Sequence, residues 1–179
     1  MSEVSVSDAP SLQDDDFKLF GLAPGFALDR AALDERWKTL QRQAHPDRFA
    51  VQGAAAQRVA MQWSVRINEA YQRLKDPLKR AAYWCELNAA PIQAHSNTAM
   101  PPAFLMQQME WREALDEADG AAAIEALLET TEAAHRALLG QLAETIDGQG
   151  NAISAAQQVR ALMFVERFAD ELHQRLDRC

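Results

Sequence analysis

The feature that most constrains this chain is a proline placed between two long amphipathic segments. Pro46 lacks a backbone N–H and disfavours helical geometry at His45, so a helix that approaches it must end there. Apolar residues before it recur every three or four positions, as on one face of a helix. They are Leu33, Trp37, Leu40 and Ala44. A second stripe follows in residues 57–74, which predicts a helical hairpin with His45, Pro46 and Asp47 exposed at its tip. The two stripes also predict that Trp37 and Trp63 meet inside this hairpin.

The composition favours an all-α protein. Seven glycines and seven prolines are spread over 179 residues that are 48% hydrophobic and 25% charged, and alanine, leucine, glutamate and glutamine favour helices. No apolar run reaches the roughly 20 residues that a membrane-spanning helix needs. Cys85 and Cys179 form no CxxC pair, which argues for reduced thiols and against a zinc site. We therefore expect a cytoplasmic protein that binds no metal and no membrane.

Charge divides the chain into two halves. Residues 1–101 carry 12 acidic and 12 basic side chains, whereas residues 102–179 carry 14 acidic and 6 basic ones, so the net charge of −8 lies in the second half. This asymmetry suggests two domains with different partners and argues against nucleic acid as the main ligand. The expected division is a disordered tail at 1–15, a first domain at 16–88, a linker at 89–102 and a C-terminal three-helix bundle at 103–179.

The helix predicted at 103–118 has two apolar faces where a small bundle needs one. One face holds Phe104, Trp111, Leu115 and Ala118. The other holds Leu105, Met106 and Met109, is bordered by Glu110 and Glu113, and can be extended by Phe164 from the last helix. An exposed patch rich in methionine is typical of an adaptable partner site. Burial of this face at a domain interface is the alternative that the pattern leaves open.

Motifs for catalysis are missing from the sequence. The histidines are His45, His95, His135 and His173, and none stands in an HExxH pattern. There is also no GxSxG and no glycine-rich phosphate loop. We expect no catalytic residue, no cofactor and no enzymatic activity.

Residues 16–88 resemble a J-domain. The resemblance depends on His45-Pro46-Asp47 between two amphipathic helices, on the basic residues of the incoming helix, and on the segment NEAYQRLKDP at 68–77. In J-proteins the tip and the basic helix bind the ATP-bound DnaK-type chaperone and stimulate its ATP hydrolysis. The resemblance implies this role for the tripeptide and, by helix position, for Arg36, Lys38 and Arg42.

The whole chain resembles the HscB family of J-proteins, the co-chaperones of iron–sulfur cluster assembly. Matching stretches lie at 17–22, 40–43, 45–47, 76–81 and 103–113. The resemblance implies an HscA/DnaK-type chaperone as one partner and an IscU-type scaffold as the other. The scaffold would bind the surface formed by Leu105, Met106, Met109, Glu110, Glu113 and Phe164.

The chain departs from that family pattern beside the tripeptide, because Ala44 stands where an aromatic residue is common, and packing near the tip should be thinner. Two other functions remain open. The protein could be a general J-protein that delivers unfolded clients to a DnaK-type chaperone. Alternatively, it could be a plain helical interaction module in which the tripeptide is incidental.

Overall fold

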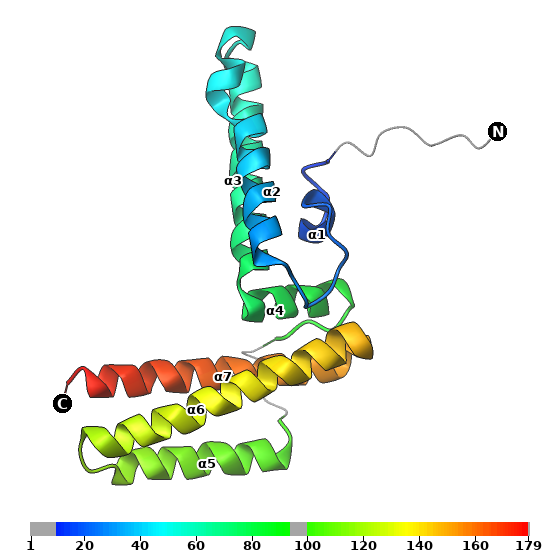
Figure 1. Cartoon of the computed structure of the whole chain (residues 1–179). Helices are drawn as coiled ribbons and strands as arrows, with labels where there is room; N and C mark the ends of the chain where they lie inside the picture. Colours follow the sequence, from blue (N-terminus) through cyan, green and yellow to red (C-terminus); the bar gives the residue numbers. More distant parts are fainter. Residues whose placement is uncertain (1–9, 94–99, 179) are drawn as a thin grey trace. The chain divides into compact units, whose positions relative to one another are not determined.

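The computed structural model describes residues 10–93 and 100–178 of the chain, and in this part it contains helices and no strand. The described residues form two compact units. The first comprises residues 10–24 and 28–76, and the second comprises residues 25–27, 77–93 and 100–178. The predicted all-α fold, a helical hairpin followed by a three-helix bundle, is confirmed (Figure 1).

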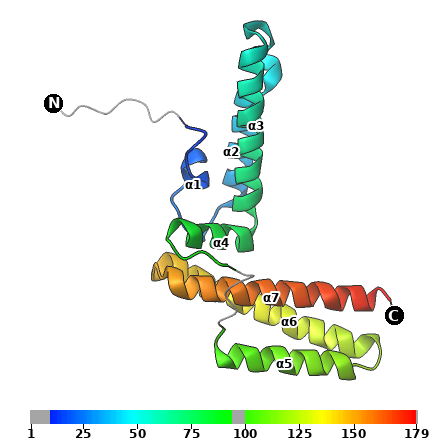
Figure 2. The same cartoon turned by 180° about the vertical axis from the view of Figure 1, so that it is seen from behind.

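The first unit is built around the predicted hairpin. Its elements are α1 (Asp16–Leu19), α2 (Arg30–Ala44), the 3-10 segment η1 (Pro46–Gln52) and α3 (Ala54–Lys75). Helices α2 and α3 lie side by side, and η1 joins them at one end (Figures 1 and 2). Asp29 caps α2 by accepting a hydrogen bond from the amide of Ala32 at 3.1 Å. At the other end His45 has the extended geometry that Pro46 imposes, with φ −63° and ψ 126°, and α2 stops there.

Inside the hairpin, one aromatic pair between α2 and α3 combines ring stacking with a hydrogen bond. The ring of Trp37 stacks on that of Tyr71, with centroids 4.7 Å apart. The hydroxyl of Tyr71 donates to Asp34 at 2.9 Å, so the stacked pair is also tied to α2 by a hydrogen bond. Trp63 instead lines a groove on the surface of this unit.

Helix α1 is anchored to the hairpin through a buried acid. Asp16 is 0% exposed, and its carboxylate lies 2.7 Å from Arg66 and 2.9 Å from Arg73, both on α3. Arg66 also donates to the carbonyl of Leu12 at 3.3 Å. The expected tail at 1–15 is thus tied to α3 from Leu12 onward, while residues 1–9 lie outside the described residues.

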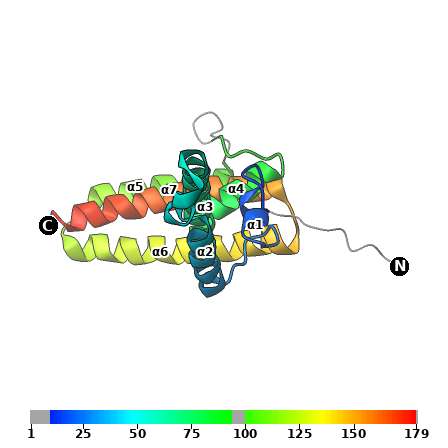
Figure 3. The same cartoon turned by 90° about the horizontal axis from the view of Figure 1, so that it is seen from above.

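The second unit contains the three-helix bundle. It consists of α4 (Pro77–Leu87), α5 (Pro102–Glu117), α6 (Ala121–Ala143), the π-helical turn η2 (Glu144–Gly148) and α7 (Ala152–Leu176). Helices α5, α6 and α7 run beside one another (Figure 3). Their shared core consists of Trp111, Leu115, Ile124, Val165, Phe168 and Leu172. The first predicted face of α5 is therefore the one that the bundle buries.

Helix α4 packs against α7 and belongs to this second unit. The buried residues of α4 are Arg80, Ala81, Trp84 and Cys85. The first domain predicted from the sequence ends at residue 88, whereas the first compact unit of the structure ends at Asp76, so the two boundaries differ by one helix. The division into functional domains stays a prediction. Within the expected linker, Ile92 is buried and its carbonyl accepts a hydrogen bond from Arg160 at 3.1 Å, while residues 94–99 lie outside the described part.

A short loop at 25–27 is also part of the second unit. The carboxylate of Asp147 in η2 accepts hydrogen bonds from the amides of Phe26 at 2.7 Å and Ala27 at 2.8 Å. A Cβ on Gly25 would approach that carboxylate to 2.8 Å, so any larger residue here would displace the Asp147 side chain. None of the helices in the described ranges is long and apolar enough to cross a membrane.

Candidate functional site

The His45-Pro46-Asp47 tripeptide lies at the exposed tip of the hairpin. Pro46 is the first residue of η1, where its missing N–H costs no hydrogen bond. The side chains of His45 and Asp47 are 58% and 89% exposed. Because neither side chain packs in the core, both are accessible to a partner.

The imidazole of His45 is oriented by the backbone of the same turn. Its Nδ1 accepts a hydrogen bond from the amide of Asp47 at 3.3 Å, which places the ring proton on Nε2. The Asp47 carboxylate lies 3.6 Å from the same Nδ1, but a nitrogen that accepts a hydrogen bond cannot form an ion pair with it. Arg48 closes the turn, since its amide donates to the carbonyl of His45 at 3.0 Å. The Asp47 carboxylate is thus exposed to solvent beside the imidazole.

The three predicted basic residues of α2 are exposed, but they do not share one face. Lys38 and Arg42 are four residues apart, so they lie on the same side of the helix. Arg36 lies about 160° around the helix from Lys38, and its guanidinium is near the turn at Gly21. The structure thus groups Lys38 and Arg42 with the tip and places Arg36 on another face.

Local partners hold the basic side chains of this face. Lys38 pairs with Glu35 at 2.8 Å, and the hydrogen bond from that carboxylate raises the pKa of Lys38. The guanidinium of Arg48 donates to the carbonyl of Arg42 at 3.2 Å, which brings a further cation to the end of α2. A positive surface therefore continues from the helix to the tip, and Arg48 belongs to it although the sequence analysis gave it no role there.

The second apolar face of α5 is exposed to solvent. Leu105, Met106 and Met109 are 43%, 62% and 72% exposed. Glu110 and Glu113 are exposed beside them, as the helical spacing predicted. The second unit itself therefore leaves this face of α5 uncovered.

Phe164 connects this face to the core of the bundle. Its half-buried ring packs edge-on against Phe104 at 5.7 Å and stacks with Trp111 at 6.4 Å and Phe168 at 5.9 Å. The ring also borders a shallow hollow next to Leu105, Met109 and Glu113. Of the predicted scaffold residues, these four therefore share one hollow, while Met106 and Glu110 lie exposed beside it.

One residue of this surface had no role in the sequence analysis. Arg112 lines the same hollow, and its guanidinium lies 6.0 Å from the ring centre of Phe164 and 5.1 Å from that of Phe168. It also forms an ion pair with Glu171 of α7. The sequence alone does not predict this role of Arg112, because the aromatic rings on which it stacks lie about 50 residues further along the chain.

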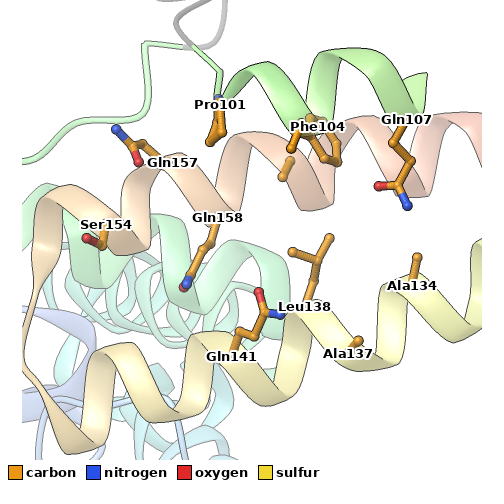
Figure 4. Close-up of a pocket in the computed structure, with 12 residues that line it drawn as sticks. Pro101, Phe104, Gln107, Ala134, Ala137, Leu138, Gln141, Ser154, Gln157 and Gln158 are labelled. Carbon is orange, nitrogen blue, oxygen red and sulfur yellow. The ribbon is translucent and has the colours of Figure 1, made fainter. Parts of the chain in front are cut away.

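A different hollow, of about 630 Å³, lies between the N-terminal part of α5 and helices α6 and α7 (Figure 4). Its described lining combines apolar side chains such as Phe104 and Leu138 with the amides of Gln107, Gln141 and Gln158, and it includes no charged residue. The described residues also contain no group of three side chains suited to a metal ion. Burial raises the pKa of Cys85 to about 11, so its thiol stays protonated and poorly reactive near neutral pH.

Comparisons with known proteins agree on one family. Residues 100–173 match the model of the HSCB C-terminal oligomerisation domain. The chain is 49% identical over 171 residues to the co-chaperone protein HscB homolog of Paraburkholderia phytofirmans, which covers 94% of this chain and 97% of that protein. It is 52% identical over 160 residues to the homolog of Bordetella avium, covering 89% of this chain and 95% of that protein.

Solved structures of the same family have the same fold. Chaperone HscB from Vibrio cholerae is 36% identical, with a TM-score of 0.77 over 92% of this chain and 99% of that one. Human co-chaperone protein HscB is 25% identical, with a TM-score of 0.85 over 93% of this chain and 84% of that one. The chain therefore belongs to the HscB family of J-domain co-chaperones of iron–sulfur cluster assembly.

Proposed function

We propose that this chain is a bivalent adaptor between an HscA/DnaK-type chaperone and an IscU-type scaffold protein. The hairpin tip engages the chaperone in its ATP state and stimulates ATP hydrolysis. The exposed face of the bundle binds the scaffold. The observation that carries the proposal is the presence of two exposed surfaces of unlike chemistry, one basic and polar and one apolar and acidic, on two separate units.

The chaperone surface comprises the tripeptide and the basic residues of α2. Asp47 supplies an exposed carboxylate, and Lys38 and Arg42 supply cations beside it. Charged groups at the rim of an interface mainly guide encounter and orientation. We assign to the same surface His45 and Pro46, which shape the turn. Arg36 lies about 160° around α2 from Lys38, so its proposed contact requires a chaperone surface that extends around the helix.

The scaffold surface comprises Leu105, Met106, Met109, Glu110, Glu113 and Phe164. Exposed methionine and leucine side chains provide an apolar contact that a partner can cover. The glutamates at its border favour a partner whose matching surface carries basic residues. Arg112, fixed by Phe168 and Glu171, holds the floor of the hollow in place.

Connecting the two surfaces in one chain gives the adaptor its effect. A scaffold held on the bundle has a raised effective concentration at the chaperone that the tip has engaged. ATP hydrolysis then coincides with capture of the scaffold. In this proposal the chaperone supplies nucleotide chemistry and the scaffold supplies the cluster, and both encounters occur in the cytoplasm.

Synergy in ATP hydrolysis tests the proposal. Single-turnover hydrolysis by the chaperone is measured with the adaptor alone, with the scaffold alone and with both. We expect the rate with both to exceed the product of the separate stimulations. Leu105→Ser with Met109→Ser should abolish that excess and preserve stimulation by the adaptor alone. Purely multiplicative rates for the unmodified chain would contradict the bivalent function.

A further inference from the structure

An apolar groove runs beside the hairpin tip and has no role in the function proposed above. It lies between α2, η1 and α3, with a volume of about 450 Å³. Ala44 and Phe49 line it near the tip, and Ala56 and Trp63 line it along α3. Val59 on the same wall is 50% exposed. Such a row of partly exposed apolar side chains can serve as a docking surface for another segment.

The described chain begins at this groove. Pro10, the first described residue, is part of the lining at the end marked by Ile67. The residues that follow are fixed to α3, because Arg66 donates to the carbonyl of Leu12 at 3.3 Å and to that of Asp14 at 2.7 Å. Pro10, to which residues 1–9 are attached, is therefore held on the wall of the groove.

The length of residues 1–9 matches the length of the groove. From Ile67 to Ala56 the rise along α3 is roughly 16 Å. An extended chain of six residues, which separates Pro10 from Val4, spans about 20 Å. Alternate residues of an extended chain point to the same side. In that conformation Val4 and Val6 would form one apolar edge, with Ser5 and Ser7 on the other.

The charges of the two parts are complementary. Arg42, Arg48 and Arg58 are exposed, and each directly precedes a residue that lines the groove. Residues 1–9 carry Glu3 and Asp8 and no basic side chain. The opposite charges of the two parts favour this pairing over docking of a basic peptide.

We propose that residues 2–9 of the same chain bind in this groove, with Val4 and Val6 as the anchors. The bound segment covers the surface next to His45, Pro46 and Asp47. As far as regulation is concerned, the inference rests on the proposed chaperone function, because a chaperone that approaches the tip must displace the segment. Binding of the segment itself does not depend on that function.

Paramagnetic relaxation in the full-length chain tests the inference directly. A nitroxide is attached to Ser5→Cys in a Cys179→Ser background, where Cys85 is fully buried and stays unlabelled. We expect broadening of the amide signals of Ala44 and Ala56 and none at Leu74, at the other end of α3. Adding Val4→Ser and Val6→Ser should remove the broadening, whereas the matched control Ser7→Ala should keep it.

Two outcomes would overturn the inference. Unbroadened Ala44 and Ala56 signals would show that the segment does not reach the groove. If an isotope-labelled chain without nitroxide is broadened as strongly by an added nitroxide-bearing chain, the groove binds a second copy instead. Either result is read from the adaptor alone, so it is independent of whether the chaperone is stimulated.

The regulatory consequence has its own readout. A segment bound about three quarters of the time would weaken the apparent affinity for the chaperone about fourfold. Deletion of residues 2–9 should therefore lower the adaptor concentration for half-maximal ATPase stimulation by that factor, and Val4→Ser with Val6→Ser should do the same. Unchanged half-maximal concentrations with positive relaxation data would show that the segment binds without competing.

Discussion

The carboxylate of Asp16 lies 2.7 Å from the guanidinium of Arg66, in a position where Asp16 is completely shielded from water. Arg73 approaches the other carboxylate oxygen at 2.9 Å. The pair joins the start of α1 to the middle of α3. A buried acid with two cationic partners is destabilising if one charge is removed, because the remaining charges keep the cost of desolvation.

Asp16→Asn is therefore expected to destabilise the first unit. Loss of a buried ionic partner costs about 3–5 kcal/mol, and the 42% exposure of the Arg73 side chain places the expected effect at the lower end. Hydrogen exchange of the α3 amides and thermal melting monitored by circular dichroism measure it. Glu35→Gln, which removes an exposed partner of Lys38, is the control and should leave both nearly unchanged. Equal effects of the two variants would contradict the structural role of Asp16.

Asp47→Asn should abolish stimulation of the chaperone ATPase and leave scaffold binding intact. The side chain is 89% exposed, so its replacement removes a contact group without disturbing the core. Single-turnover hydrolysis measures the first property and calorimetric titration with the scaffold measures the second. Unchanged melting is the control for folding. A joint loss of both activities in a normally folded variant would mean that the two sites are not separate.

Lys38→Ala with Arg42→Ala should weaken chaperone binding more than Arg36→Ala. The first two lie on one side of α2, while Arg36 lies near Gly21 on another side. Binding is measured at low and high salt, because screening reduces the contribution of exposed charges. The double variant should show a smaller salt dependence than the unmodified chain. A larger effect of Arg36→Ala would move the interface to the Gly21 side of the helix.

Met109→Ser should weaken scaffold binding alone, whereas Phe164→Ala should lower both scaffold binding and the stability of the bundle. Met109 is 72% exposed, so its replacement should weaken scaffold binding and leave the melting temperature unchanged. Phe164 stacks with Trp111 and Phe168, and aromatic pairs add about 0.5–1.5 kcal/mol each, so its loss should lower both. Calorimetry and melting of the two variants test this. A destabilised Met109→Ser variant would show that Met109 supports the fold.

The hairpin and the bundle follow from local rules. Pro46 ends α2, Asp29 begins it, and the apolar spacing of α5 separates a core face from an exposed face. The contacts that the sequence did not reveal join residues that are far apart in the chain. Asp16 looks like one of three acids at a helix start, yet it pairs with cations 50 and 57 residues further along.

In the two proposed binding surfaces, too, the contacts that the sequence did not reveal join residues of different elements. Periodicity placed Leu105, Met106 and Met109 on one face, but the role of Arg112 depends on Phe168 and Glu171 in another helix. Resemblance assigned Arg36, Lys38 and Arg42 together, while helical geometry separates Arg36 from the other two. Likewise, Trp37 stacks on Tyr71, whereas pattern alone predicted that Trp37 would meet Trp63 inside the hairpin.

Calorimetric titration of the full-length chain with the cluster-free scaffold tests the central claim most directly. The titration is repeated with Leu105→Ser and Met109→Ser in one variant, after its helicity and melting have been shown to be unchanged. We predict that the unmodified chain binds and that the variant binds at least about tenfold more weakly, a loss of roughly 1.4 kcal/mol. Equal affinity of the two proteins, or no binding by the unmodified chain, would contradict the scaffold site on α5.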